Sequence, residues 1–375
     1  MPGTAVRQDV IRAARRIVVK VGTNSICDDD GRLKRRAISA LARQVARLRE
    51  DNRAVTLVVS GAIGAGMGEL KLPRRPRTMP RLQAAAAVGQ GQLMRTFHDI
   101  FAKRGLRVGQ VLVTRSDFED RTRYLNIRNT LRSLEELGAV AIINENDTVA
   151  VDEIRFGEND VLAAMVTNML GADLLVLLTN VPGVLRGGAV LDVIEEVDDG
   201  VRALVTRSRS RHGSGGMASK LTAAAMVTEA GEAAIIAAAD EPNVLTKIMT
   251  GKTIGTVFVP ATEKMSSRRR WIGQVSRAAG RIAIDPGAER ALRKRGKSLL
   301  PSGITSVSGT FHKGDTIIIE DAGGREIARG LTNYDAAQIE RIKGLRSAQI
   351  APALGDKPYD EVVHRDNMTL TAAGG

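Results

Sequence analysis

The chain has 375 residues, of which 43% are hydrophobic and 26% charged, and this globular composition excludes wholesale disorder and suggests two or three domains. A single cysteine, Cys27, excludes an intrachain disulfide and, with four scattered histidines, a zinc cluster; the absence of a signal segment or a long apolar run adds to the expectation of a cytoplasmic protein with no membrane partner. The net charge is +13, and its surplus of positive charge is concentrated just after position 265, because residues 266–300 hold ten basic residues against two acidic ones.

Up to about residue 260, short apolar runs alternate with helix-like stretches. The predicted strands span 16–21, 55–60, 108–114, 139–145, 173–180, 233–239 and 256–260. The predicted helices span 35–50, 81–104, 121–137, 159–170 and 217–230. Continuous apolar runs spaced by helices are typical of buried parallel strands, so we expect an α/β fold with an open, mostly parallel sheet sandwiched by helices. Ligands of such sheets bind at the carboxyl ends of the strands.

The pattern changes after residue 262, where a polar, basic stretch suggests a linker. Short strands with turns follow, at 280–285, 303–311, 316–321 and 326–333, with one clear helix at 286–295. These features predict a small, mostly β, barrel-like domain. We therefore divide the chain into a first domain at 1–262, a linker at 263–279, a second domain at 280–355, and a frayed polar tail at 356–375.

The first two strands end in groups suited to anions. Lys20 lies inside an apolar strand and is followed by Gly22, so its ammonium group must reach solvent or meet an anion. Ser60 stands at the tip of the next strand, before Gly61 and three further glycines. Small residues ahead of a helix N-terminus favour an anion site, although a plain glycine-rich turn would read the same way.

Two clusters of amide and acidic residues follow the fourth predicted strand. One contains Asn144 and Asp147, and the other contains Glu158, Asn159 and Asp160. Helix capping and turn formation alone would account for one such cluster. Two clusters favour a polar site for a substrate that carries an ammonium group and carboxylates.

Thr179 and Asn180 end the fifth strand, and a loop rich in glycine and serine precedes the helix at 217–230. Free backbone N–H groups at a helix N-terminus, together with Lys220, suit a triphosphate. No G-x-x-x-x-G-K-[ST] sequence is present, so the protein is not a P-loop enzyme. The residues of the predicted phosphate loop are Ser214, Gly215, Gly216, Met217, Ala218, Ser219 and Lys220.

Five motifs occur in one order: KVGT from residue 20, SGA from 60, NEND from 144, GEND from 157 and GGMASK from 215. Together they resemble the amino acid kinase family, in particular its glutamate-phosphorylating members. The segment 298–317 and the HRDNM sequence at 364–368 resemble the PUA domain fused to many bacterial members. The resemblance implies ATP-dependent phosphorylation of the γ-carboxylate of L-glutamate, the first step of proline biosynthesis, with feedback inhibition by proline and a homodimer or homotetramer.

The resemblance also implies roles for the motif residues. Lys20, Lys220 and Asp160 are the expected catalytic residues, with Asp160 holding both lysines. The expected glutamate-binding residues are Ser60, Asn144, Asp147 and Asn159. The expected ATP-binding residues are Lys20, Gly22, Gly61, Thr179, Asn180 and the loop from Ser214 to Lys220. Magnesium is expected to arrive with ATP rather than in a protein cage.

Three departures from the family pattern concern Glu158, Asn180 and a short hairpin after Gly183. The last two bear on how the nucleotide is held. Two alternatives stay open: another acceptor within the same fold, such as acetylglutamate, aspartate or UMP, and RNA binding through the PUA-like domain and the basic segment 266–300.

Overall fold

The computed structural model describes residues 2–149, 159–206, 216–260, 266–356 and 358–371. The chain forms two compact units, one ending at residue 264 and the other beginning at 265, with residues 119–121 belonging to the second. No helix in the described ranges is long and apolar enough to cross a membrane.

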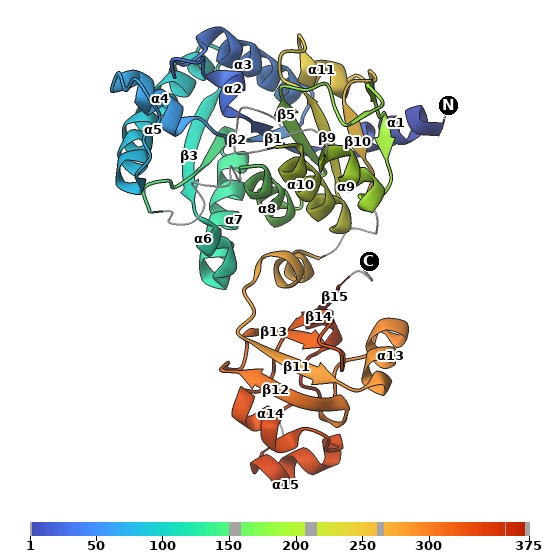
Figure 1. The fold of residues 1–375 in the computed structure, drawn as a ribbon. Helices are drawn as coiled ribbons and strands as arrows, with labels where there is room; N and C mark the ends of the chain where they lie inside the picture. Colours follow the sequence, from blue (N-terminus) through green and yellow to red (C-terminus); the bar gives the residue numbers. More distant parts are fainter. Residues whose placement is uncertain (1, 150–158, 207–215, 261–265, 357, 372–375) are drawn as a thin grey trace. The chain divides into compact units, whose positions relative to one another are not determined.

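The first unit is built on one eight-stranded sheet, which contains all seven predicted strands (Figure 1). The six neighbouring strands from β3 at one edge to β9 are mutually parallel, whereas β10 runs antiparallel to β9 and parallel to the short β8 at the other edge. The prediction of an open, mostly parallel sheet is therefore confirmed. In spatial order the strands are β3 (Arg107–Val113), β4 (Ala139–Glu145), β2 (Ala54–Val59), β1 (Arg16–Val21), β5 (Leu174–Thr179), β9 (Ala233–Ala238), β10 (Thr256–Phe258) and β8 (Val193–Ile194). A separate hairpin pairs β6 (Leu185–Arg186) with β7 (Ala189–Val190).

Helices cover the sheet on two sides, so strands such as β5 are buried along their whole length. Alternate residues of β1, namely Ile17, Val19 and Val21, enter the core formed with α3 and α5. The period of two sends Val18 and Lys20 to the opposite side of the sheet. The helices of this unit are α1 (Pro2–Ala13), α2 (Thr23–Ile26), α3 (Arg35–Glu50), α4 (Ala62–Glu69), α5 (Met79–Ala102), α6 (Arg115–Glu119), α7 (Arg121–Glu136), α8 (Asn159–Leu170), α9 (Asp199–Thr206), α10 (Met217–Glu229) and α11 (Val244–Met249).

The second unit contains a five-stranded, mostly antiparallel sheet with short helices around it, which confirms the predicted mostly β domain. Its strands in spatial order are β12 (Ile304–Gly309), β11 (Gly280–Ile284), β13 (Thr316–Glu320), β14 (Glu326–Leu331) and β15 (Met368–Leu370). Its α-helices are α12 (Ser267–Arg270), α13 (Pro286–Arg295), α14 (Ala336–Ile342) and α15 (Ile350–Leu354). A π-helical turn spans Trp271–Val275, and 3₁₀ turns span Pro301–Gly303, Ser347–Gln349 and Arg365–Asn367.

The expectation of a frayed tail after residue 355 is wrong for residues 358–371. Val362 and Val363 are fully buried, and β15 pairs with β14 at the edge of the sheet. A few apolar residues are enough to order this polar segment, because the open edge of the sheet supplies hydrogen-bond partners for the backbone of a strand that reaches it. The expectation of a single helix in this unit is also wrong, since α14 and α15 are present; Asp335 begins α14 with a capping box that Gln338 completes.

The segment expected to be a linker, 263–279, is folded over its described part. It forms α12 and the π-helical turn that follows, and Trp271 and Ile272 in that turn are buried. Burial of these two side chains offsets the cost of ordering a basic, polar stretch.

Candidate active site

Lys20 is a buried cation on the side of the sheet that α8 covers. Its side chain is 7% exposed, and its Nζ lies 2.7 Å from Oδ1 of Asp160 in the first turn of α8. A charge in such a place requires a partner, because burial of an unpaired ammonium group is prohibitive. Of the two partners expected for the ammonium group of Lys20, solvent or an anion, the structure shows the anion.

Lys220 reaches the same carboxylate from the first turns of α10. Its Nζ donates to Oδ2 of Asp160 at 2.9 Å, and the hydroxyl of Ser219 donates to the same oxygen at 2.8 Å. Both lysines and Asp160 are buried. The structure therefore brings together the three residues that the sequence singled out as catalytic, from β1, α8 and α10.

The electrostatics of this cluster leave an excess of positive charge. Burial lowers the pKa of Lys20, an effect that Asp160 opposes and the neighbouring Lys220 reinforces. Burial also acts to raise the pKa of Asp160, but the two lysines together hold that pKa below its usual value. One carboxylate cannot neutralise two ammonium groups, so the cluster is suited to receive a further anion.

Asn159 lies next to Asp160 and links the ends of two neighbouring strands, β2 and β4. Its amide nitrogen donates to the carbonyl of Val59 at 3.0 Å, to the hydroxyl of Ser60 at 2.7 Å and to Oδ1 of Asn144 at 3.0 Å. Its own side-chain oxygen is buried and accepts no hydrogen bond from the described residues. An unsatisfied acceptor in a polar cluster is what an incoming donor would complete.

Gln90 belongs to this cluster, although the sequence reasoning missed it. Its side-chain oxygen accepts a hydrogen bond from the amide of Asn144 at 2.9 Å, and its side-chain nitrogen is buried with no partner among the described residues. Gln90 comes from the middle of α5 and is far along the chain from the end of any strand. The expectation that ligand-binding residues follow directly after strands therefore could not locate it.

One sequence signal for Gln90 exists in the glycines of α4 and α5. A Cβ on Gly66 would stand 1.7 Å from the carbonyl oxygen of Ala85, and one on Gly89 would stand 1.8 Å from that of Ala62. These two glycines let the helix backbones touch, which places Gln90 beside the strand ends. Glycines facing each other across two helices are thus a packing signal, which our interpretation of the run after Ser60 did not include.

Three glycines stand at the expected phosphate positions, two of them with free space beside them and one with a backbone conformation that favours glycine. A Cβ on Gly22 would project to within 3.7 Å of the Lys20 ammonium group, and a Cβ on Gly216 would meet no atom of the described residues within 4 Å. Gly61 has φ of +108° at the N-cap of α4, a conformation that requires glycine. Gly216 is the N-cap of α10, whose first turn holds Met217 and Ala218 and has no side-chain cap. Its N–H groups are therefore available to an anion.

Thr179 and Asn180 stand at the tip of β5, as expected, with Thr179 buried and Asn180 exposed. The Thr179 hydroxyl donates to the side-chain oxygen of Asn180 at 3.3 Å. Glu158, Ser214 and Gly215 lie outside the described residues. No described residues form a cluster of three His, Cys, Asp or Glu side chains that would hold a metal ion.

Asp147 stands apart from the Asn159 cluster. It is half-buried in the turn after β4, and among the described residues no hydrogen bond joins its carboxylate to Ser60, Asn144 or Asn159. Burial raises the pKa of Asp147 to about 6, while Arg75 acts in the opposite direction. Arg75 comes from the basic, proline-containing loop after α4, so this loop contributes to the electrostatic surroundings of Asp147.

The fold and these motifs define a class of enzyme, and comparison with known proteins identifies it. The model of the amino acid kinase family matches residues 15–238, and the model of the PUA domain matches residues 280–354. The chain belongs to the amino acid kinase family and carries a PUA domain, as the sequence motifs predict; it is a kinase.

The similar curated proteins have a more specific name. A protein from Moorella thermoacetica named glutamate 5-kinase is 45% identical over 364 residues, covering 95% of this chain and 96% of the relative. A glutamate 5-kinase from Caldanaerobacter subterraneus is 43% identical over 366 residues, covering 96% and 98%. A third, from Syntrophus aciditrophicus, is 43% identical over 371 residues, covering 97% and 96%.

Proposed function

We propose that the protein transfers the γ-phosphate of Mg-ATP to the γ-carboxylate of L-glutamate, giving L-glutamyl 5-phosphate in the first step of proline biosynthesis. The observation that carries the proposal is the junction of Lys20 and Lys220 on Asp160, directly beside the Asn159 cluster. The names of the full-length relatives support glutamate as the acceptor.

The chemistry requires cations rather than a base. A γ-carboxylate is ionised at neutral pH, so no group needs to remove a proton from it. The barrier is the repulsion between the carboxylate and the phosphate oxygens, which for a unit pair at 4 Å is about 4 kcal/mol at an effective dielectric constant near 20. Lys20 and Lys220 offset this repulsion and stabilise the charge on the transferring group, a role worth about 10³–10⁵ in rate in related reactions.

The remaining residues divide between the two substrates. Asn159, Asn144, Ser60 and Gln90 form the polar pocket for glutamate, and Asp147 receives its ammonium group. On the other side, Gly22, Gly61 and the first turn of α10 donate backbone N–H groups to phosphate oxygens. Thr179 and Asn180 lie where the nucleoside of ATP would rest.

Magnesium fits this site as part of the nucleotide. The described residues offer no set of three carboxylates for an all-protein cage, and Mg²⁺ commonly binds through one or two carboxylates and substrate phosphates. The ion would supply neutralisation of phosphate charge. The residues of the chain would hold and orient the two substrates and exclude water.

The test is an ATP-dependent assay that traps the acyl phosphate as a hydroxamate, run beside a coupled assay of ADP release, which also detects phosphorylation of an acceptor without a carboxylate such as UMP. We expect turnover with glutamate, and little with acetylglutamate, aspartate or UMP. The proposal fails if one of these three acceptors is used with a higher kcat/KM than glutamate, or if no hydroxamate forms with glutamate.

We also propose, from the resemblance to glutamate kinases, that proline inhibits the enzyme and that the chain assembles into a dimer or tetramer. The same assay with added proline measures the first, because inhibition would appear as a raised KM or a lowered kcat. Sedimentation equilibrium of the intact chain measures the second. A monomer with full activity that is insensitive to proline would contradict both parts.

A further inference from the structure

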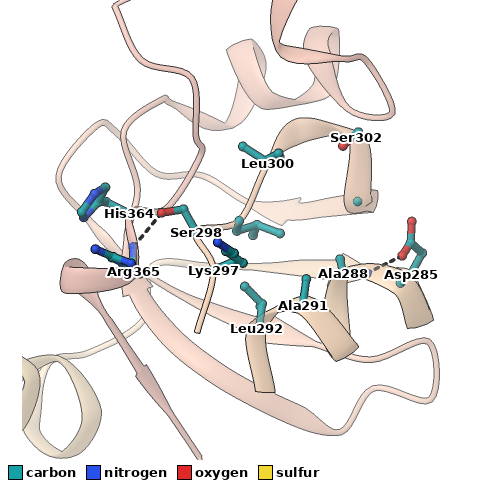
Figure 2. A pocket seen from close by; sticks show the side chains of 13 residues that line it. Asp285, Ala288, Ala291, Leu292, Lys297, Ser298, Leu300, Ser302, His364 and Arg365 are labelled. Atoms are coloured by element: carbon teal, nitrogen blue, oxygen red, sulfur yellow. Dashed lines mark hydrogen bonds between the residues drawn. The ribbon is translucent and has the colours of Figure 1, made fainter. Parts of the chain in front are cut away.

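The second unit contains a pocket of about 620 Å³ that the proposed kinase reaction does not use. Pockets that bind small molecules typically enclose about 300–1,000 Å³, with apolar walls and a few placed polar groups. This pocket lies between α13 and the chain from Lys297 to Gly303 that follows it, and His364 and Arg365 complete its wall (Figure 2).

The local sequence explains why the pocket forms. Asp285 caps α13 by accepting the N–H of Ala288 at 2.7 Å, and Gly296 ends the helix with a positive φ of 55°. The chain then turns back along the helix, and Leu299 forms a β-bridge with Val363. That bridge brings Arg365 beside Ser298, whose hydroxyl accepts the Arg365 N–H at 3.0 Å.

The pocket has two chemically different parts. Ala288, Ala291 and Leu292 of α13 present small and apolar surface to it, as Figure 2 shows. Toward the other wall, Figure 2 shows His364 and Arg365 gathered beside Ser298. A ligand that fits both parts has an apolar body and a polar head.

The charges around the polar part favour an anionic head. Lys297 forms no ion pair with any described residue, and it lines the pocket with Arg365. His364 accepts the N–H of Asp366 on Nδ1 at 3.2 Å, which leaves the proton of the neutral ring on Nε2 as a donor. The carboxylate of Asp366 lies 3.9 Å from Arg365 and 3.6 Å from Nδ1 of His364, but it is 68% exposed and does not line the pocket. Asp285 lines the opposite end, where it serves as the helix cap.

We propose that this pocket binds a small organic anion, with its phosphate or carboxylate head on Lys297, Arg365 and His364 and its apolar body against Ala288, Ala291 and Leu292. Phosphate monoesters and carboxylates share the chemistry that these donors recognise, since both present oxygens to basic side chains. The site is built entirely from the second unit, so its binding does not depend on the kinase residues.

Calorimetric titration of the full-length protein tests this proposal. The kinase site is first saturated with AMP-PNP and glutamate, so that added anions are excluded from it. Phenyl phosphate and 4-phenylbutanoate then probe the two head groups, inorganic phosphate probes a head alone, and benzyl alcohol probes a body alone. We expect phenyl phosphate or 4-phenylbutanoate to bind at least about tenfold more tightly than inorganic phosphate and benzyl alcohol, because only they fill both parts.

Variants locate the binding. Lys297→Ala combined with Arg365→Ala should weaken the tighter probe at least about tenfold, and Ala291→Phe should do so by filling the apolar part. Arg295→Ala is the matched control, because it removes an exposed charge of the same helix that does not line the pocket; it should change the affinity less than about threefold. Hydroxamate turnover and the melting temperature show whether each variant folds. If Ala291→Phe does not fold, the Lys297→Ala/Arg365→Ala protein decides the test, because both of its substitutions are at exposed positions.

Three results would overturn the proposal. The first is no binding of either amphipathic probe below about 10 mM. The second is binding that the Lys297→Ala/Arg365→Ala protein retains. The third is displacement of the probe by a single-stranded RNA oligomer that binds far more tightly and with a steep dependence on salt, which would make the region a polyanion surface instead.

Discussion

Lys20 and Lys220 hold different oxygens of one carboxylate, at 2.7 Å and 2.9 Å from Asp160, although β1 and α10 are far apart in the chain. Each lysine would be untenable alone in this buried place, and Asp160 makes both tolerable. The arrangement fixes the two ammonium groups before any substrate arrives. Such preorganised charge is the main means by which phosphoryl-transfer enzymes lower their barrier.

Replacing Lys220 tests this directly. Lys220→Ala should lower kcat by at least about 10³-fold, because it removes one of the two cations that we propose to face the transferring group, while Asp160 keeps its pair with Lys20. The hydroxamate assay measures the loss. Lys247→Ala is the control, since Lys247 pairs with Glu241 at a partly exposed site and should keep normal turnover. A Lys220→Ala protein with near-normal kcat would refute the assignment.

Removing the shared carboxylate should reduce stability as well as activity. Asp160→Asn leaves two buried ammonium groups without a counter-charge, so we expect a loss of about 3–5 kcal/mol in the free energy of unfolding. Urea denaturation measures it. Glu50→Gln breaks only an exposed pair with Arg47 and should cost less than about 1 kcal/mol. Equal stabilities of the two variants would show that the buried ion pairs of Asp160 stabilise the fold no more than the exposed pair of Glu50 does.

Asp147 predicts how glutamate use depends on pH. Its pKa of about 6 means that the carboxylate of the free enzyme is charged above that pH and protonated below it. If the charge binds the ammonium group of glutamate, kcat/KM should fall as the pH drops through 6, approaching about tenfold per pH unit.

The matched variants separate this effect from general loss of activity at low pH. Asp147→Asn should have a low kcat/KM that is nearly constant between about pH 5 and 7. Asp51→Asn, at the end of α3, should keep the wild-type profile. A wild-type profile in Asp147→Asn would mean that another group titrates.

Gly61→Ala tests the backbone turn at the end of β2. A side chain at φ of +108° is strained, and its Cβ would lie 3.1 Å from the Sγ of Cys27, so we expect a loss of about 1–3 kcal/mol and a marked fall in kcat. Gly64→Ala, three residues further in α4, meets only ordinary contacts and should be neutral or stabilising by up to about 1 kcal/mol. Thermal unfolding and turnover of both proteins decide the matter, and a Gly61→Ala protein that is as stable and active as Gly64→Ala would rule out strain.

Gln90→Leu tests the residue that strand-end reasoning missed. The substitution leaves the side-chain amide of Asn144 without its acceptor, and an unsatisfied buried donor costs about 1–3 kcal/mol. We expect this cost to weaken the binding of glutamate, so that its KM rises by about tenfold or more. The effect on kcat should be smaller. Gln92→Leu, on the same helix but outside the cluster, should leave KM within about twofold of normal. An unchanged KM in Gln90→Leu would remove Gln90 from the substrate pocket.

Much of the site was predictable because parallel strands obey simple geometry. Lys20, Ser60, Asn144 and Thr179 each stand in or directly after an apolar run, and parallel strands bring such positions to one edge of a sheet. The fold class followed in the same way, from continuous apolar runs that are typical of strands covered on both faces. Local patterns thus located most of the candidate residues.

The tertiary structure decided what those patterns leave open. Only packing brings α5 close enough for Gln90 to reach Asn144, closes the pocket at Lys297 and Arg365, and recruits Val362, Val363 and β15 into the second unit. The sequence by itself determined where the strands of the first unit end and where its main helices lie, because apolar runs and the stretches between them are features of a few neighbouring residues. Contacts between distant segments depend on how whole helices and sheet edges fit together, and no local period encodes that fit.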